Sequence, residues 1–407
     1  MTQRSYGKLR SALRRSDGVR RLSQQGMSEP EIRRFARTYV RPFFRNPKNL
    51  FDFDTGLLVN LLDRLLVFRR NTRLQPQYEH CLDIYRSAEA LSPQASMVVC
   101  EQSQLAMRAG ETTLWSDGAL AVPTHGLSLE DLALHEFRTV GGMLESIIKL
   151  YLQELLCQVE IGGGQPNPKS EVDTRSLGAV VNELLDKTSL SDLLRPPPWG
   201  VRLNQWRNIA QHYLWEVKKA TIICSYGTPP RIRTVAISKD ELSQLYSTTV
   251  DVMHCLVAAR TVFLLDRPTP ALEIAYGGSL RDEAVVADFV RGASAYGLDV
   301  TEFSIDDESA EAVIRDLKED DAGLRKRFAL GTAYALWVFF GRARVMVEYQ
   351  DSNGTPRLSV TLTDDQCVRI REEGLDSLMD PHELPQIVHW HGNQNPIGSE
   401  TASCGNE

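Results

Sequence analysis

An arginine, an asparagine and a histidine lie close together in the stretch VRLNQWRNIAQHYLWEVKK, which runs from Val201 to Lys219. Arg207 is followed directly by Asn208, and His212 comes four residues after that asparagine. Histidine gives and takes protons near neutral pH, and arginine stays charged and can grip phosphate oxygens as negative charge builds up on them. RNA supplies its own nucleophile, the 2′-hydroxyl, so these residue types are suited to cleaving RNA without a metal, although Arg and His at this spacing also arise often by chance.

Apolar residues recur in the same stretch at the three-and-four spacing of an amphipathic helix. They are Leu203, Trp206, Ile209, Ala210, Tyr213, Leu214 and Val217. On such a helix Asn208 and His212 share a face, at the border of the apolar stripe. The prolines of the preceding LLRPPPWG fix where this helix begins. One such trio per chain supplies a single histidine for acid–base chemistry, so we expect a dimer axis to bring two trios together.

A structural role is the alternative for these residues, with Arg207 in an ion pair and His212 hydrogen-bonded at the edge of the helix. The neighbouring elements favour a functional role. Two apolar, alternating runs around Gly-Thr-Pro-Pro (227–230) predict a β-hairpin. The residues SKDE that follow predict a capping box and a long apolar helix to about Leu265.

The order of elements over residues 127–266 resembles the HEPN family of helical domains. The signature of that family is an arginine, four to six residues and a histidine, usually with a polar residue directly after the arginine, and Arg207, Asn208 and His212 match it. The resemblance implies a metal-independent endoribonuclease of the bacterial toxin or phage-defence type, active as a homodimer and giving 2′,3′-cyclic phosphate ends. It implies no cofactor, and it makes a regulatory or antitoxin protein a candidate partner. Some HEPN domains are instead non-catalytic dimerisation or nucleotide-binding modules, and this remains the alternative.

The first long helix of the HEPN-like region is expected from Leu127 to Glu160, with a capping start at SLED, and a short second helix from Leu177 to Leu185. Glu145 and Lys149 stand at i and i+4 in the first of these helices, which most simply predicts an intrahelical ion pair. Some HEPN families have a similar Glu-x-x-x-Lys near the active site. These two residues are therefore second-rank site candidates.

Composition predicts an ordinary soluble protein. The 407 residues are 42% hydrophobic and 24% charged, with a net charge of −7, which argues against a protein that coats nucleic acid non-specifically. The seven cysteines form no CxxC pair, as expected in a reducing cytosol. No apolar signal segment opens the chain, and the longest uncharged apolar run, 328–341, is too short to span a bilayer. We therefore expect a cytoplasmic protein with no membrane partner.

Charge is uneven along the chain. Residues 1–45 contain twelve Lys and Arg against three Asp and Glu, whereas residues 282–322 contain thirteen acidic residues against three basic ones. The basic segment predicts contact with an RNA backbone; a solvated helix face, or packing on the acidic segment, explains it equally well. The candidate RNA-binding residues are Arg14, Arg15, Arg20, Arg21, Arg33, Arg34 and Arg37.

The flanks predict mixed secondary structure, so the fold class is mostly α with α+β flanks around a HEPN-like helical bundle that contains the hairpin. The N-terminal region, 1–125, is expected to be helical from 49 to 90, with two or three short strands between 92 and 125. A mixed α/β domain is expected over 270–395, followed by a disordered tail at 396–407.

In the C-terminal domain, strands are predicted at ALEIAY and LDVTEFSI, and helices at 281–296, 308–317 and 329–340. The alternating runs around Ser-Asn-Gly (352–354) predict a second hairpin. His382, His389 and His391 fit no zinc framework, so we expect no metal site.

Overall fold

The structure is a computed structural model, in which the chain divides into two compact units. One unit comprises Met1–Ala36, Asp54–Asn60 and Arg281–Glu407, and the other comprises Arg37–Phe53 and Leu61–Leu280. The residues that the structure describes are 4–5, 27, 29–51, 58, 61–62, 64–119, 126–166, 168–267, 286, 289–290, 293, 297–317, 322–378 and 384–391.

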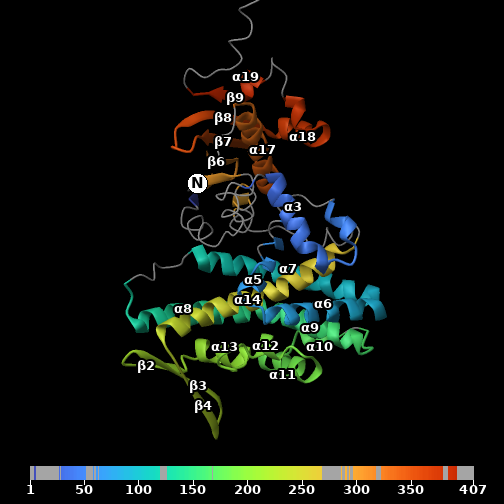
Figure 1. The fold of residues 1–407 in the computed structure, drawn as a ribbon, viewed down its shortest axis with the longest axis vertical. Coiled ribbons are helices and arrows are strands. Elements are labelled where there is room, and N and C mark those ends of the chain that lie inside the picture. The colour runs from blue at the N-terminus through green and yellow to red at the C-terminus, as the bar shows by residue number, and fades with distance from the viewer. Residues whose placement is uncertain are drawn as a thin grey trace, which may run out of the picture. The chain divides into compact units, whose positions relative to one another are not determined.

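Long helices pack side by side to form the core of the second unit (Figure 1). They are α6 (Leu74–Leu91), α7 (Pro93–Ala119), α14 (Lys239–Leu265) and a continuous run of α8 (Leu129–Met143), the π-helical turn η3 (Leu144–Ile148) and α9 (Lys149–Gly162). This confirms the long helix expected from Leu127. The helical region expected from residue 49 is divided instead. It includes the 3-10 helix η2 (Pro47–Phe51) and the short α5 (Val67–Arg70), and the chain leaves the helix at Asn71 before α6 begins.

Helix α7 replaces the short strands that the sequence predicts between residues 92 and 125, so that prediction is wrong. Its buried side is formed by Val99, Cys100, Ser103 and Met107, at helical spacing, and it packs against α6 and α9. The local alternation of apolar and polar residues is real, but packing against neighbouring helices decides the conformation. Residues 120–125 lie outside the described part.

The capping start predicted at SLED and the capping box predicted at SKDE are both confirmed. Ser128 caps α8 by accepting a hydrogen bond from the backbone N–H of Asp131 at 3.1 Å. Ser238 and Glu241 form the complete capping box of α14. By length and composition α14 could cross a membrane, but most of its apolar stretch is buried inside the unit, as in the core helix of a soluble protein.

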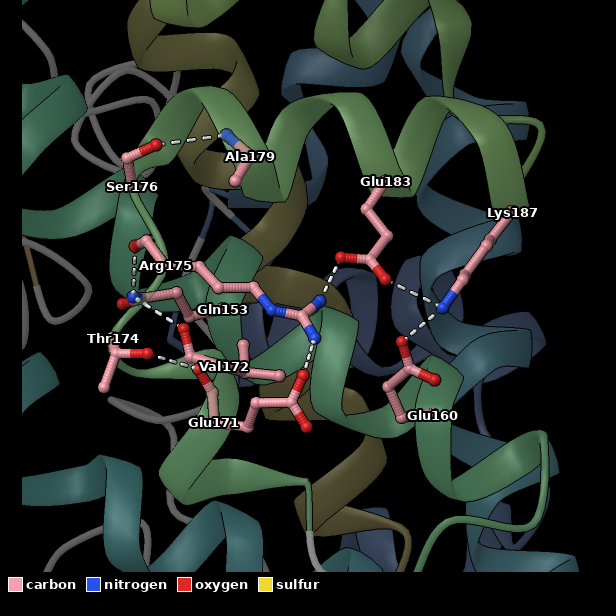
Figure 2. Close-up of polar contacts among 10 residues, drawn as sticks. All are labelled: Gln153, Glu160, Glu171, Val172, Thr174, Arg175, Ser176, Ala179, Glu183 and Lys187. Atoms are coloured by element: carbon pink, nitrogen blue, oxygen red, sulfur yellow. Dashed lines mark hydrogen bonds and ion pairs between the residues drawn. The ribbon is translucent and has the colours of Figure 1, made fainter.

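Short helices cover one side of this bundle (Figure 1): α10 (Lys169–Val172), α11 (Leu177–Lys187), α12 (Ser191–Leu194) and α13 (Leu203–Gln211). Figure 2 shows how α9, α10 and α11 are joined: Glu183 of α11 lies between Arg175 and Lys187, and Lys187 also reaches Glu160 of α9. The buried Gln153 amide donates to backbone carbonyls of the loop before α11, at 3.2 Å to Asp173. These contacts fix the short second helix expected from Leu177.

A three-stranded antiparallel sheet connects α13 to α14. Its strands are β2 (Trp215–Lys218), β3 (Thr221–Thr228) and β4 (Arg231–Ile237), in the order β2-β3-β4. The hairpin expected at this place is confirmed as β3 and β4. Ile222, Cys224 and Ile237 on one face of the sheet are buried, so the half of the sheet nearest α14 packs against the unit.

The other unit contains a six-stranded sheet of order β1-β5-β6-β7-β8-β9, in which β1 is only the pair Arg4–Ser5. The sheet contains two antiparallel hairpins: β5 (Leu298–Ile305) with β6 (Ser309–Asp316), and β7 (Arg344–Gln350) with β8 (Pro356–Thr363). Helix α17 (Ala322–Phe340) connects β6 to β7, and these two strands are parallel. Further elements are α18 (Asp364–Glu373), η4 (Leu375–Leu378), α19 (Leu384–Ile387) and β9 (Val388–Trp390).

The helix predicted at 308–317 is wrong, because β6 occupies that segment. Alternate residues of β6 are buried, and the strand is hydrogen-bonded to β5 on one side and β7 on the other, which overrides the helix propensity of its Ala and Glu residues. The strand LDVTEFSI, the apolar helix and the second hairpin are confirmed as β5, α17 and β7–β8. The strand predicted at ALEIAY and most of the helix predicted at 281–296 lie outside the described residues, as does the tail 396–407.

The chain is thus a mixed α+β protein, and its division differs from the boundaries expected from sequence. Residues 61–119 belong to the unit that contains residues 127–266, because α6 and α7 pack against α9 and α14. Helix α3 (Glu29–Val40), in the basic segment, is followed by the 3-10 helix η1 (Arg41–Phe43).

Candidate functional site

Helix α13 holds Arg207 and Asn208, and it ends earlier than its sequence pattern suggests. Leu203–Gln211 is helical, but Tyr213 adopts a left-handed conformation, with φ of 54°. The N–H of Leu214 then donates to the carbonyl of Ile209 at 3.1 Å, the hydrogen bond that closes a Schellman-type helix end. The helix predicted over Val201–Lys219 is therefore wrong beyond its first half.

The second half of that stretch forms β2 because it has better partners as a strand. Trp215 pairs with Cys224 of β3, and the Trp215 ring stacks on Phe137 of α8 at a centroid distance of 5.5 Å. The apolar residues at Trp215 and Val217 alternate as well as repeating helically, so the local pattern fits both structures. Pairing with β3 decides between them.

Arg207 is held at two of its nitrogens. Its Nε donates to Oε2 of Glu145 at 2.8 Å, and its Nη1 donates to Oδ1 of Asn208 at 3.1 Å. The other carboxylate oxygen of Glu145, Oε1, accepts from Nζ of Lys149 at 2.8 Å. We refer to Glu145, Lys149, Arg207 and Asn208 as the ion-pair cluster. Both the intrahelical pair expected between Glu145 and Lys149 and an ion pair of Arg207 are present.

The ion-pair cluster is open to solvent on one side. The exposed fractions of the Glu145, Lys149 and Arg207 side chains are 31%, 24% and 28%, which leaves room for a ligand to reach the charged groups. A guanidinium has five N–H donors, and two serve Glu145 and Asn208 here. The remaining donors of Arg207 can bind a phosphate while the first two hold the side chain in place.

A π-helical turn places Glu145 opposite Arg207. Glu145 lies within η3 (Leu144–Ile148), and single π-turns inside α-helices occur often at functional sites. Just before this turn the chain approaches α13 closely: a Cβ added at Gly141 would lie 3.0 Å from Cβ of Ala210. A glycine at 141 therefore allows α8 to approach α13 closely enough for the Glu145 carboxylate to meet Arg207.

The charge state of Glu145 follows from its surroundings. Partial burial raises the pKa of Glu145, but hydrogen bonds and charge interactions with Lys149 and Arg207 outweigh it and lower that pKa below the usual range. The carboxylate is thus ionised at neutral pH. With the two cations it leaves one net positive charge, which suits a phosphate ligand.

His212 caps the C-terminal end of α13, and its side chain is exposed. Its backbone N–H donates to the carbonyl of Asn208 at 3.0 Å, so His212 follows Asn208 by one helical turn, as the sequence predicts. Within the described residues, the imidazole makes no hydrogen bond. It is therefore available for proton transfer rather than committed to the structural hydrogen bond of the alternative hypothesis.

The candidate RNA-binding arginines of the N-terminal segment lie apart from this cluster in the sequence. Arg33, Arg34 and Arg37 belong to α3, and Nε of Arg37 donates to the carbonyl of Leu50 at 3.2 Å. None of the three is without an interaction partner. Arg14, Arg15, Arg20 and Arg21 lie outside the described residues.

Metal-ligating groups do not gather in the described part of the chain: no three His, Cys, Asp or Glu side chains there are placed to hold an ion together. His389 lies on β9 with an exposed side chain, and His391 follows that strand. His382 lies outside the described residues.

Two features of the site escape prediction from the sequence. One is the direct ion pair between Glu145 and Arg207: the sequence marks both as site candidates, but no local feature pairs them. The other is Gln205, whose Oε1 accepts a hydrogen bond from the N–H of Gly227 at 3.1 Å and so joins α13 to β3. No feature of the sequence predicts that contact.

Comparison with known proteins gives no relative: no family model, no curated protein and no solved structure matches this chain.

Proposed function

We propose that this chain is a metal-independent endoribonuclease of HEPN type, a cytoplasmic toxin or defence effector that acts as a homodimer. The observation that supports this most directly is the arrangement of Arg207. Its guanidinium is fixed by Glu145 and Asn208 with free donors left over, at a solvent-open site, and an exposed His212 follows Asn208 by one helical turn. A fixed cation and a free imidazole are the groups that phosphodiester transfer requires.

The reaction needs no external nucleophile. A histidine removes the proton of the RNA 2′-hydroxyl, and the oxygen attacks the adjacent phosphorus as the bond to the 5′-oxygen breaks. A second proton donor protonates the departing 5′-oxygen, which leaves a 2′,3′-cyclic phosphate and a 5′-hydroxyl. Arg207 stabilises the charge that develops on the non-bridging oxygens, and Asn208 keeps Arg207 in place.

A homodimer supplies the second histidine. Tyr213 and Leu214 directly follow His212 and expose 66% and 39% of their surface, although both are large apolar side chains. Exposed aromatic and aliphatic residues at this place fit a surface that a second copy covers. The pairing would bring two His212 and two Arg207 side chains into one cleft.

The test is incubation of the purified protein with defined RNAs in EDTA, followed by analysis of the cleavage ends. We expect His212→Ala and Arg207→Ala to lose RNA cleavage by about 10²-fold or more, since acid–base and charge stabilisation each contribute on that scale. Gln211→Ala, at an exposed position between the two, is the matched control and should cleave normally. The expected ends are 2′,3′-cyclic phosphates.

A wild-type protein that leaves RNA intact would contradict the proposal, as would full activity in a folded His212→Ala variant. The ion-pair cluster would then be structural, and the chain a dimerisation or nucleotide-binding module. Toxicity on overexpression, relieved by the same two substitutions, extends the test to cells. A regulatory or antitoxin partner would be recognised by its suppression of that toxicity.

A further inference from the structure

The β3–β4 hairpin extends beyond the helices of its unit (Figure 1). We refer to residues 225–234 as the hairpin arm. Arg231 and Arg233 are exposed there, opposite Thr228 and Tyr226 of β3, so both arginines and the half-buried Tyr226 share one face of the sheet. Neither guanidinium forms a hydrogen bond or ion pair with any residue that the structure describes.

The sheet that carries the arm is basic in an acidic protein. Between Trp215 and Ser238 the sequence has four cations, at Lys218, Lys219, Arg231 and Arg233, and one anion, Glu216, for a net charge of 4 − 1 = +3. The whole chain has a net charge of −7. Glu216 lies 2.5 Å from Lys218, at the far end of the sheet from the arginines. The arginine end of the arm therefore attracts polyanions while most of the protein repels them.

The arm is joined to the helix that holds the candidate site. Strand β3 extends past the end of β2, so some backbone N–H groups of β3 on that edge have no partner in β2. These N–H groups donate instead to residues in α13 and just after it. The N–H of Ser225 donates to the carbonyl of Leu214 at 2.7 Å, and the N–H of Gly227 donates to Oε1 of Gln205 at 3.1 Å. Gln205, Asn208 and His212 stand at i, i+3 and i+7, on one side of α13. The arm therefore begins beside the same side of the helix as Asn208 and His212.

We propose that the hairpin arm is a binding site for single-stranded RNA, with Arg231 and Arg233 on phosphates and Tyr226 stacked on a base. This inference rests on the proposed ribonuclease function and names how that enzyme holds its substrate. An aromatic ring flanked by arginines suits a single strand because only unpaired bases can stack on it. Because the arm begins beside α13, an RNA strand bound on the arm would extend toward His212.

A second copy of the chain is a poorer occupant of the same surface. The outer edge of β4 has no strand partner in the described part of the chain, so edge-to-edge pairing is the competing explanation. Antiparallel pairing of two β4 strands about Ile232 would set Arg231 of one copy opposite Arg233 of the other. Like charges directly opposite each other destabilise such a pair.

The test measures RNA binding separately from cleavage. Full-length protein with His212→Ala, which blocks turnover, is titrated with a labelled oligouridylate at several salt concentrations. We expect Arg231→Gln/Arg233→Gln to weaken binding and to make the slope of log K against log salt shallower by about 1.4, the loss of two phosphate contacts on a single strand. The control is Arg73→Gln/Arg195→Gln, which removes the same charge from exposed positions on other elements and should leave binding unchanged.

Tyr226 gives an independent measurement. Tyr226→Ala should weaken binding roughly 5- to 150-fold with an unchanged salt slope, since stacking contributes on that scale, and Tyr226→Phe should bind like the parent. Unchanged RNA affinity in the double arginine variant would overturn the inference. If that variant also self-associates, the role of the two arginines is to prevent edge-to-edge pairing of β4 strands. If RNA binding depends on the arm but the wild-type protein cleaves no RNA, the proposed RNA-binding site is supported and the proposed ribonuclease function is contradicted.

Discussion

Glu145 accepts a 2.8 Å hydrogen bond from Nε of Arg207, although the two residues are 62 positions apart in the sequence. The contact joins the π-helical turn η3 to α13 and fixes the direction of the guanidinium. Lys149 occupies the other oxygen of the same carboxylate, so Glu145 is shared by two cations. An arginine held in this way loses little conformational entropy when it binds a phosphate.

Glu145→Gln should therefore reduce RNA cleavage, although Glu145 itself performs no chemistry in the proposed mechanism. The amide keeps the shape of the side chain but removes the charge that orients Arg207, and misplaced catalytic groups lose up to about 10²-fold in rate. Single-turnover rates with a defined RNA measure this effect. Lys149→Met leaves the contact between Glu145 and Arg207 in place and is expected to cost less. Equal losses in the two variants would show that Glu145 does not act by positioning Arg207.

The lowered pKa of Glu145 predicts how stability depends on pH. Because its pKa is lower in the folded protein than in the unfolded chain, the ion pairs stabilise the fold fully above the unfolded value, about 4.3, and this contribution is lost as pH falls through the folded value. For a partly exposed cluster we expect about 1 kcal/mol or less at neutral pH. The free energy of unfolding of wild type should exceed that of Glu145→Gln between pH 5 and 7, and the two should converge in acid. A difference that stays constant down to pH 3 would contradict this assignment.

Elements with strong local signals are predictable from this sequence. The capping box at Ser238 and the apolar run after it predict α14, and the turn residues between two alternating runs predict β3–β4 and β7–β8. In each case the signal lies within the segment that folds, so no knowledge of distant partners is needed.

Elements decided by distant partners are not predictable in this way. Helix α7 and strand β6 have patterns that fit either structure, and their neighbours in the folded unit decide. The candidate site shows the same limit. Arg207, Asn208 and His212 could be selected as chemically suitable, but the end of α13 at Gln211 depends on the left-handed Tyr213 and on β3, and the pairing with Glu145 depends on the packing of α8.

Gly110→Ala should destabilise the helical unit. A Cβ at this position would lie 2.1 Å from the backbone carbonyl oxygen of Ser146, so α7 would have to move away from η3. We expect a loss of about 1–3 kcal/mol, the usual cost of overpacking a core, as measured by urea denaturation. Gly331→Ala is the matched control, because its Cβ would meet nothing within 4 Å in α17, and it should be neutral or stabilising by up to about 1 kcal/mol. A Gly110→Ala variant as stable as wild type would show that α7 does not pack so closely on η3.

Arg260 of α14 and Glu154 of α9 form a buried ion pair. Nε of Arg260 donates to Oε1 of Glu154 at 2.8 Å, and the two side chains expose 7% and 0% of their surface. Tyr85 donates to the same oxygen at 2.8 Å, and Nη2 of Arg260 donates to the carbonyl of Cys100 at 2.9 Å. Arg260→Met alone would leave an unpaired buried carboxylate, so we expect it to lower the free energy of unfolding by about 3–5 kcal/mol. Arg260→Met with Glu154→Leu and Tyr85→Phe removes the charges and the orphaned hydroxyl together, and it should recover most of that loss. Denaturation of the single and triple variants measures the difference, and a triple variant no more stable than the single one would mean that the network contributes net stability beyond the cost of an unpaired charge.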